Sequence, residues 1–290
     1  MAEIMNLNSS VLEGSVIDQE IRRRVWCSLY MTDMWCISGQ GLHSQMKDVQ
    51  VKIELPMNDS TFVSFKTGQP FTTDPKEAGI WAQMMTLVPI FGPIYNINRL
   101  MANGEPKTIE LDRQVEELAR SLQDWKAKLP ADAQMNQANL LRRQRHGQGG
   151  VLISIHLAYH HYSTLLYFRY LEAQRPTSAT DRTYAARCKA HASSFSSLLR
   201  QSRQLKGCDV VFPNISHMAT VSSSVLLHTL LFGELDELPT VRQELNSNFE
   251  ALIELAQYWP TTSAMVRVLS IEEWSSSLQS STLSSSHHPS

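Results

Sequence analysis

The stretch from Asp18 to Ile37 restricts the possible folds of this chain more than any other part of the sequence. Its apolar residues recur every three or four positions, which is the period of an α-helix, and they cover well over half of the helix circumference. These residues are Ile17, Ile21, Val25 and Leu29 along one stripe and Trp26, Tyr30, Met34 and Ile37 along another. A helix this apolar is buried on most of its sides. Ser15 and Asp18 have the spacing of a capping box, which predicts that the helix begins there.

The charges of this helix lie mainly near its start. Glu20 precedes Arg23 and Arg24 by three and four residues, the spacing at which side chains pair along a helix. We expect one arginine of the Arg22–Arg24 run to pair inward and the others to face solvent; the alternative is an internal ion-pair node that responds to a ligand or a partner helix. Asp33 lies in an apolar stripe and must find a cation or reach water, because an unpaired buried carboxylate is costly. We interpret Asp33 as a structural, salt-bridged carboxylate rather than a catalytic base.

Two runs in this region carry a family resemblance. The first reads E-I-R-R-R-V-W-C-S-L-Y-M-T-D, and the second, after a Gly-rich exit, reads D-V-Q-V-K-I-E-L-P. Together they resemble the signature of the fungal-specific transcription factor domain, the middle homology region of regulators that bind DNA through a binuclear, six-cysteine zinc cluster. The matching residues are Glu20, Arg22, Arg23, Arg24, Trp26, Tyr30, Asp33, Asp48 and Pro56. The sequence departs from the family at Cys27, where a second Trp is common, and at Gly41-Leu42-His43, which replaces Gly-Arg-Pro.

The resemblance extends from about Ser15 to Leu278 and implies a fold and a domain division. It implies an all-α, multi-helix regulatory domain over residues 15–278. We expect a disordered N-terminus (1–14) before this domain and a disordered tail (279–290) after it, because the Ser-rich composition of the tail is too polar to fold. Helices that precede the Arg-run helix in the family have no counterpart here, so we expect a domain truncated on its N-terminal side. The face bearing Trp26, Tyr30 and Met34 would then remain as an exposed apolar patch.

Charge and cysteine content limit the cofactors and partners. A net charge of -2 and a pI near 6.6 give no basic face for direct contact with nucleic acid. Four cysteines are too few for a six-cysteine cluster, so we expect no zinc cofactor in this chain and structural roles for Cys27, Cys36, Cys188 and Cys208. No signal-peptide pattern or membrane-length apolar run is present, which predicts an intracellular protein. The resemblance implies a nuclear location.

The remaining sequence predicts further helices and one extended segment. Alternating apolar residues predict that extended segment near residues 49–55, with a polar loop from Asn58 to Thr73. A helical region from Asp74 is expected to kink or break around Pro89 to Pro93. A basic, Gly-ended loop is expected around Arg142 to Gly150. The other predicted helices cover residues 111–129, 151–174, 181–204, 213–232, 239–259 and 264–278.

Candidate site residues are few. Aromatic residues beside the expected kink predict a possible ligand cavity, for which ordinary core packing is the competing interpretation; its residues are Trp81, Phe91, Tyr95 and His156. His156 and His160 have the i, i+4 spacing that presents two imidazoles to one metal ion, but the sequence shows no third ligand, so no metal site is predicted. No catalytic motif is present, so no catalytic residue is predicted.

The resemblance implies a transcription regulator that acts through protein partners, and control of a biosynthetic or nutrient-use pathway is what the family makes common. We expect the partner to be either a full-length zinc-cluster regulator or a second copy of the chain, and we expect only indirect contact with DNA and no contact with a membrane. The alternative is a helical domain that senses a small molecule and has no direct transcriptional role. A third class, an all-α enzyme, requires a convergent polar cluster that the sequence does not show.

Overall fold

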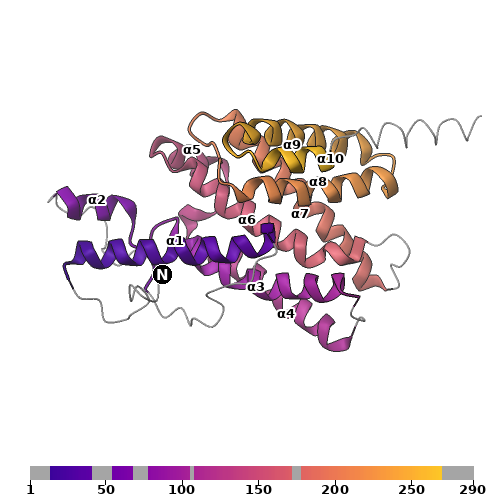
Figure 1. Cartoon of the computed structure of the whole chain (residues 1–290), viewed down its shortest axis with the longest axis horizontal. Coiled ribbons are helices and arrows are strands. Elements are labelled where there is room, and N and C mark those ends of the chain that lie inside the picture. The colour runs from indigo at the N-terminus through magenta and orange to yellow at the C-terminus, as the bar shows by residue number, and fades with distance from the viewer. Residues whose placement is uncertain (1–13, 41–53, 68–77, 105–107, 172–177, 270–290) are drawn as a thin grey trace, which may run out of the picture.

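The computed structural model describes residues 14–40, 54–67, 78–104, 108–171 and 178–269. This part of the chain folds into ten α-helices and two 3-10 turns (Figure 1). The helices are α1 (Val16–Gln40), α2 (Asp59–Thr67), α3 (Ala82–Ala102), α4 (Ile109–Lys128), α5 (Gln137–Arg145), α6 (Gly149–Tyr167), α7 (Ala179–Gln204), α8 (Asn214–Phe232), α9 (Leu238–Tyr258) and α10 (Thr262–Leu269); the turns are η1 (Ala131–Ala133) and η2 (Phe168–Leu171). Within the described ranges the only β pairing is an isolated bridge between Met57 and Ala78. The all-α prediction is confirmed.

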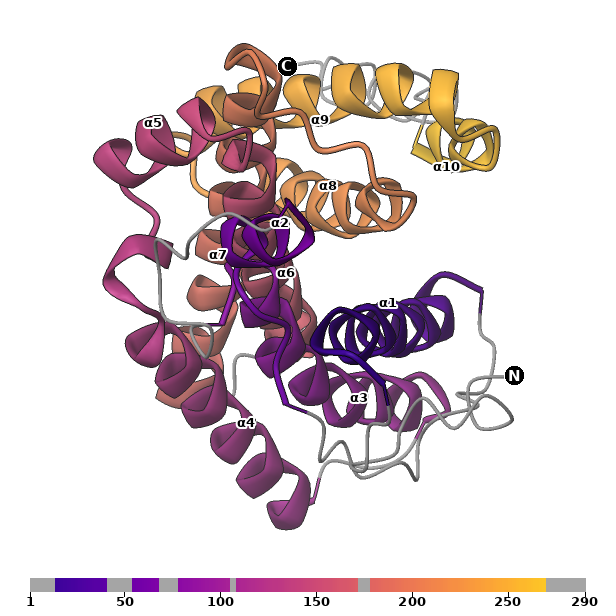
Figure 2. The same ribbon diagram turned by 90° about the vertical axis from the view of Figure 1, so that its left-hand side faces the viewer.

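Helix α6 lies at the centre of the molecule. Its sequence is apolar or aromatic on nearly every side, and most of its side chains are buried. It packs against α3, α4 and α5 on the N-terminal side of the chain and against α7 and α8 on the C-terminal side. Figure 2 shows α3 and α4 at one end of the molecule and α8, α9 and α10 at the other, with α6 and α7 between them. One continuous core therefore joins the early and late helices.

The polar loop predicted over residues 58–73 is wrong where the structure describes it, because Asp59–Thr67 forms α2. Asn58 starts this helix, since its Oδ1 accepts the Ser60 N–H at 3.1 Å. The ring of Phe62 then packs under the Arg24 guanidinium of α1, with 4.6 Å between the ring centre and Cζ. Tertiary contact with α1 thus stabilises a nine-residue helix that has little helical signal of its own.

Two further expectations differ from the structure. The basic segment predicted as a loop forms α5, whose N-cap Asn136 accepts the Asn139 N–H at 2.9 Å. Helix α3 continues without a break through Pro89 and Pro93. Both prolines lie between core residues, so burial of the surrounding apolar side chains outweighs the lost backbone hydrogen bonds. Several expectations fall on residues that the structure does not describe: the extended segment up to residue 53, the helix start at Asp74, and the predicted disordered ends apart from Gly14.

Helix α8 is long and apolar enough to cross a membrane by length and composition. Half of it is buried within the structure, where it packs against α6, α7 and α9. A core helix passes the same test, so this is weak support for a membrane span.

The start of α6 lies close to residues 208–209, which connect α7 to α8. Because of this close contact, we expect that adding a single methyl group at Gly150 changes the stability of the fold. A Cβ atom at Gly150 would lie 2.7 Å from the backbone oxygen of Asp209, whereas a Cβ at Gly92 in α3 would meet no atom within 4 Å. We expect Gly150→Ala to lower the free energy of unfolding by about 1–3 kcal/mol through this clash. Gly92→Ala is expected to raise it by about 0.5–1 kcal/mol, because alanine favours a helix interior. Urea denaturation of both variants checks the opposite signs; destabilisation by both would contradict the argument.

Candidate functional site

A buried ion-pair node lies at the N-terminal half of α1. The Glu20 side chain is 0% exposed and accepts a hydrogen bond from Arg23 Nη1 through its Oε2. Its Oε1 accepts from Arg24 Nε at 2.8 Å and from the Met57 backbone N–H at 3.1 Å. Arg22 faces solvent. Two arginines of the run therefore pair inward, which corrects the expectation that only one would do so.

The node fixes α1 to the segment that leads into α2. Arg24 Nη1 donates to Asp59 Oδ1 at 2.6 Å, and Arg24 Nη2 donates to the Met57 carbonyl at 2.9 Å. Arg23 Nη2 donates to Glu54 at 2.9 Å, and the buried Pro56 lies between these contacts. Glu20, Arg23 and Arg24 of the predicted family signature thus lie together and are connected by charge-assisted hydrogen bonds. These contacts connect α1 to the segment 54–59 through ion pairs and hydrogen bonds.

The face of α1 that bears Trp26, Tyr30 and Met34 is buried, so the exposed patch expected there is wrong. Helices of the same chain cover it: α1 packs against α3 and α8, as Figure 2 shows in a view nearly along α1. Trp35 Nε1 also donates to the Tyr162 hydroxyl of α6 at 3.2 Å. Asp33, which was expected to find a cation or reach water, is half-buried.

The opposite side of α1 presents an exposed apolar row, which we call the α1 stripe. It consists of Ile21, Val25 and Leu29, which are 46%, 42% and 41% exposed and lie one helical turn apart. The hydroxyls beside it, on Ser28 and Thr32, donate to the carbonyls four residues earlier at 2.9 and 2.8 Å. Because those hydroxyl protons are already used within the helix, the surface is less polar than its sequence suggests. Exposed apolar rows of this kind are typical of contact sites for other helices.

The four residues of the predicted cavity have contacts in three different places. The rings of Phe91 and Tyr95 contact each other, with centres 6.2 Å apart, whereas Trp81 stacks on Phe212 at 5.7 Å. His156 Nε2 is hydrogen-bonded to the Ala133 carbonyl at 2.9 Å. The structure thus brings Phe91 and Tyr95 together but connects Trp81 and His156 to other parts of the core.

The histidine pairing differs from the one that the spacing suggested. His160 of α6 lies against His191 of α7, with 3.0 Å between their Nδ1 atoms, while His156 has its own backbone partner. Burial lowers the pKa of His160 to about 2 and that of His191 to about 4, so both rings are neutral near pH 7. Among the described residues, no group of three or more His, Cys, Asp or Glu side chains is placed to hold a metal ion.

The described cysteines behave as small apolar residues. Cys27, Cys188 and Cys208 are unpaired by disulfides and buried. Burial raises the pKa of Cys27 to about 11 and raises that of Cys188 as well, so these thiols stay protonated near pH 7. A protonated, enclosed thiol is a poor nucleophile and metal ligand, as expected for cysteines with structural roles. The side chain of Cys36 lies outside the described part.

The node and the α1 stripe both lie within the region that matches a known protein family. The model of the Fungal specific transcription factor domain matches residues 3–127. Nitrogen assimilation transcription factor nit-4 of Neurospora crassa is 25% identical over 166 residues, which cover 57% of this chain and 14% of that protein. No solved structure matches the chain. The extension of the resemblance to Leu278 stays a prediction beyond the matched residues. The family predicted from the Arg-run signature is confirmed over residues 3–127, where the chain is similar to the Fungal specific transcription factor domain.

Proposed function

We propose that this chain is a regulatory domain of a fungal transcription regulator of the zinc-cluster type, and that it acts in the nucleus through protein partners. The family match over residues 3–127 and the similarity to a transcription factor support this role. The net charge of -2 argues against direct contact with DNA, so DNA is reached through the partner. The chain is proposed to have neither a catalytic role nor a zinc cofactor. The name of the relative, a nitrogen assimilation factor, favours control of a nutrient-use pathway.

The observation that carries this proposal is the position of the α1 stripe within the matched region. The stripe lies on a helix whose opposite face is buried and whose N-terminal half is fixed by the Glu20 node. A helix held this rigidly presents its exposed side chains without a large entropic cost on binding. The partner is proposed to present an apolar helix face of its own, from either a zinc-cluster regulator or a second copy of this chain.

The proposal predicts a specific loss of association when the α1 stripe becomes polar. We expect the triple variant Ile21→Gln, Val25→Gln and Leu29→Gln to reduce partner recovery and promoter occupancy at least about tenfold, since each buried aliphatic side chain contributes roughly 1 kcal/mol or more to an interface. Glutamine keeps the helix, because its helix propensity is high. The measurement is co-purification of the tagged full chain from its own cells, with promoter occupancy determined in the same sample.

A matched control replaces exposed apolar residues elsewhere: Leu231→Gln, Leu235→Gln and Ile253→Gln, which start from 54%, 84% and 56% exposure. This control is expected to retain association. Sedimentation of the purified chain separates the two partner types, because only self-association changes its mass. Normal promoter occupancy by the stripe variant, with an unchanged melting temperature, would contradict the proposed interface. Absence of any promoter signal from the unmodified chain would contradict the regulatory role itself.

A further inference from the structure

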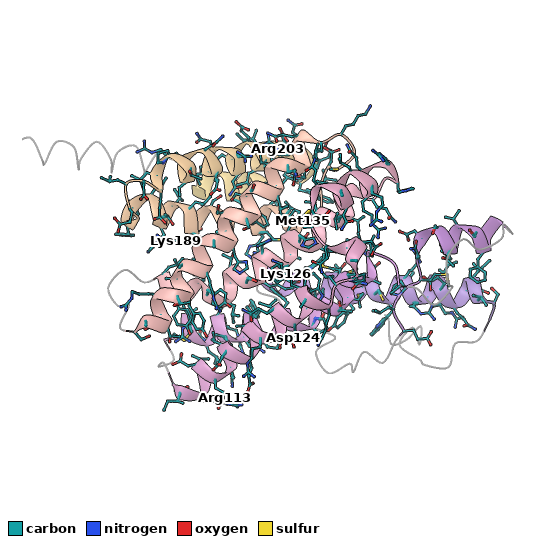
Figure 3. All side chains as sticks on the ribbon, turned by 180° about the vertical axis from the view of Figure 1, so that it is seen from behind. Arg113, Asp124, Lys126, Met135, Lys189 and Arg203 are labelled. Carbon is teal, nitrogen blue, oxygen red and sulfur yellow. The ribbon has the colours of Figure 1, made fainter. Side chains whose placement is uncertain are left out.

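A large groove lies at the junction of α7, α8 and α9, away from the Arg-run helix. It has a volume of about 930 Å³ and opens between η2, α7, the end of α8 and the start of α9. Its floor is aliphatic, with the buried residues Leu226 and Val241, and the exposed ring of Phe232 lies at its rim. Lys189 of α7, labelled in Figure 3, lies along one wall. A groove of this size and lining is typical of a small-molecule site.

The groove contains a buried carboxylate that is only partly satisfied. Glu244 of α9 is 8% exposed, and its Oε1 accepts a hydrogen bond from Ser193 Oγ of α7 at 2.5 Å. Its Oε2 is buried, and no donor among the described residues reaches it. A buried carboxyl oxygen without a donor is costly and rare in native proteins. The groove therefore holds an acceptor in position for a donor from outside the chain.

The two cationic side chains among the described groove residues, Lys189 and Arg182, are either paired elsewhere or far along α7 from Ser193. Lys189 Nζ donates to Glu237 Oε2 at 3.0 Å, and that oxygen also accepts the Glu234 N–H at 3.2 Å. Arg182 lines the groove but lies eleven residues before Ser193 on α7, roughly 16 Å of helix rise. Burial lowers the pKa of His228, which also lines the groove, so that ring is neutral near pH 7. Among the described residues that line the groove, no unpaired cation therefore lies beside Glu244.

We propose that this groove binds an organic primary amine, with the ammonium group on Glu244 and an aliphatic body over Leu226 and Val241. An ammonium group carries both the charge and the N–H donors that Oε2 requires. The aliphatic floor supplies apolar contact for a carbon chain of several atoms. The proposal does not depend on the transcriptional role, and it places a ligand site away from the cavity expected around Trp81 and Phe91.

Ligand-observed NMR on the purified full chain tests this with hexylamine as the probe. We expect hexylamine to bind with a dissociation constant of about 1 mM, in line with the efficiency of a ligand of this size. Hexyltrimethylammonium keeps the charge but lacks N–H donors, hexan-1-ol keeps a donor but lacks the charge, and hexanoate carries the opposite charge. Each of these three is expected to bind at least about tenfold more weakly, since charged hydrogen bonds are the strong ones.

Two variants locate the site. Glu244→Gln is expected to weaken hexylamine binding at least about tenfold, whereas Glu250→Gln, an exposed glutamate on the same helix, is expected to leave it unchanged. If Glu244→Gln does not fold, Thr240→Trp fills the groove from its exposed rim and should weaken binding as well. Equal binding of hexylamine and hexyltrimethylammonium, undiminished binding by Glu244→Gln or Thr240→Trp, or no binding by the unmodified chain up to about ten times the expected dissociation constant would overturn the proposal.

Discussion

Replacing Glu20 by alanine is expected to lower the free energy of unfolding by about 3–5 kcal/mol, the cost of breaking a buried ion pair from one side. The variant leaves the Arg23 side chain, only 10% exposed, with Glu54 as its remaining ion-pair partner, and that glutamate is 85% exposed. It also removes the acceptor of the buried Met57 N–H. Chemical denaturation of the full chain measures the change.

The matched control is Glu110→Ala in α4. Glu110 also pairs with an arginine three residues later, Arg113, which is labelled in Figure 3. Both side chains of this pair are more than half exposed. Its loss is expected to cost no more than about 1 kcal/mol, because water screens exposed pairs and solvates the arginine that remains. Equal effects of the two substitutions would mean that burial does not determine the strength of the Glu20 node.

Acid is expected to destabilise the chain strongly between pH 6.5 and about 4 because of the His160–His191 pair. The pKa values of both rings are lower in the folded chain than the ordinary value of 6.5, chiefly through burial. Above pH 6.5 the rings are neutral in both the folded and the unfolded chain, so the two histidines do not reduce the free energy of unfolding there. Below it the unfolded chain binds more protons, and each ring lowers stability by about 1.4 kcal/mol per pH unit, on the order of 5 kcal/mol for the pair by pH 4.5.

Urea denaturation as a function of pH checks this expectation. His191→Phe removes one titrating ring and is expected to reduce the slope of stability against pH between 6.5 and 4.5. Lys126 and Arg187, whose charges also lower the pKa of His191, are unchanged in this variant. The control is His146→Phe at an exposed histidine, which should keep the full slope. A free energy of unfolding that stays constant down to pH 4.5 in the unmodified chain would contradict this expectation, because it would mean that protonating the two rings does not destabilise the fold.

The sequence alone determined the features that depend on neighbours along the chain. The 3.6-residue period predicted an all-α fold, and α4 and α7 occupy nearly the expected residues. The pairing of Glu20 with Arg23 and Arg24 was predictable as well, because helix geometry brings residues three and four apart together. The ordered signature of the Arg-run helix was sufficient to predict the family that the comparison then matched.

The sequence also carried a signal for the groove that was easy to overlook. Glu244 lies three residues after Val241 and one before Leu245, within the apolar register of α9. A carboxylate in an apolar stripe indicates a buried polar contact, which is also our interpretation of Asp33. The neighbouring sequence does not reveal the partner of Glu244, however. Ser193 is fifty-one residues away along the chain.

Only the tertiary structure decided which apolar face of α1 is buried, which histidines meet and where the groove forms. Helix α1 has two apolar stripes of similar strength, and packing against α3 and α8 buries the one with Trp26 while leaving Val25 exposed. His160 meets His191 instead of His156, which is nearer along the chain, and Phe62 of α2 packs against Arg24 of α1. Periodicity specifies the direction of each side chain relative to its own helix axis, whereas contacts between helices depend on packing across long sequence separations, which no local pattern encodes.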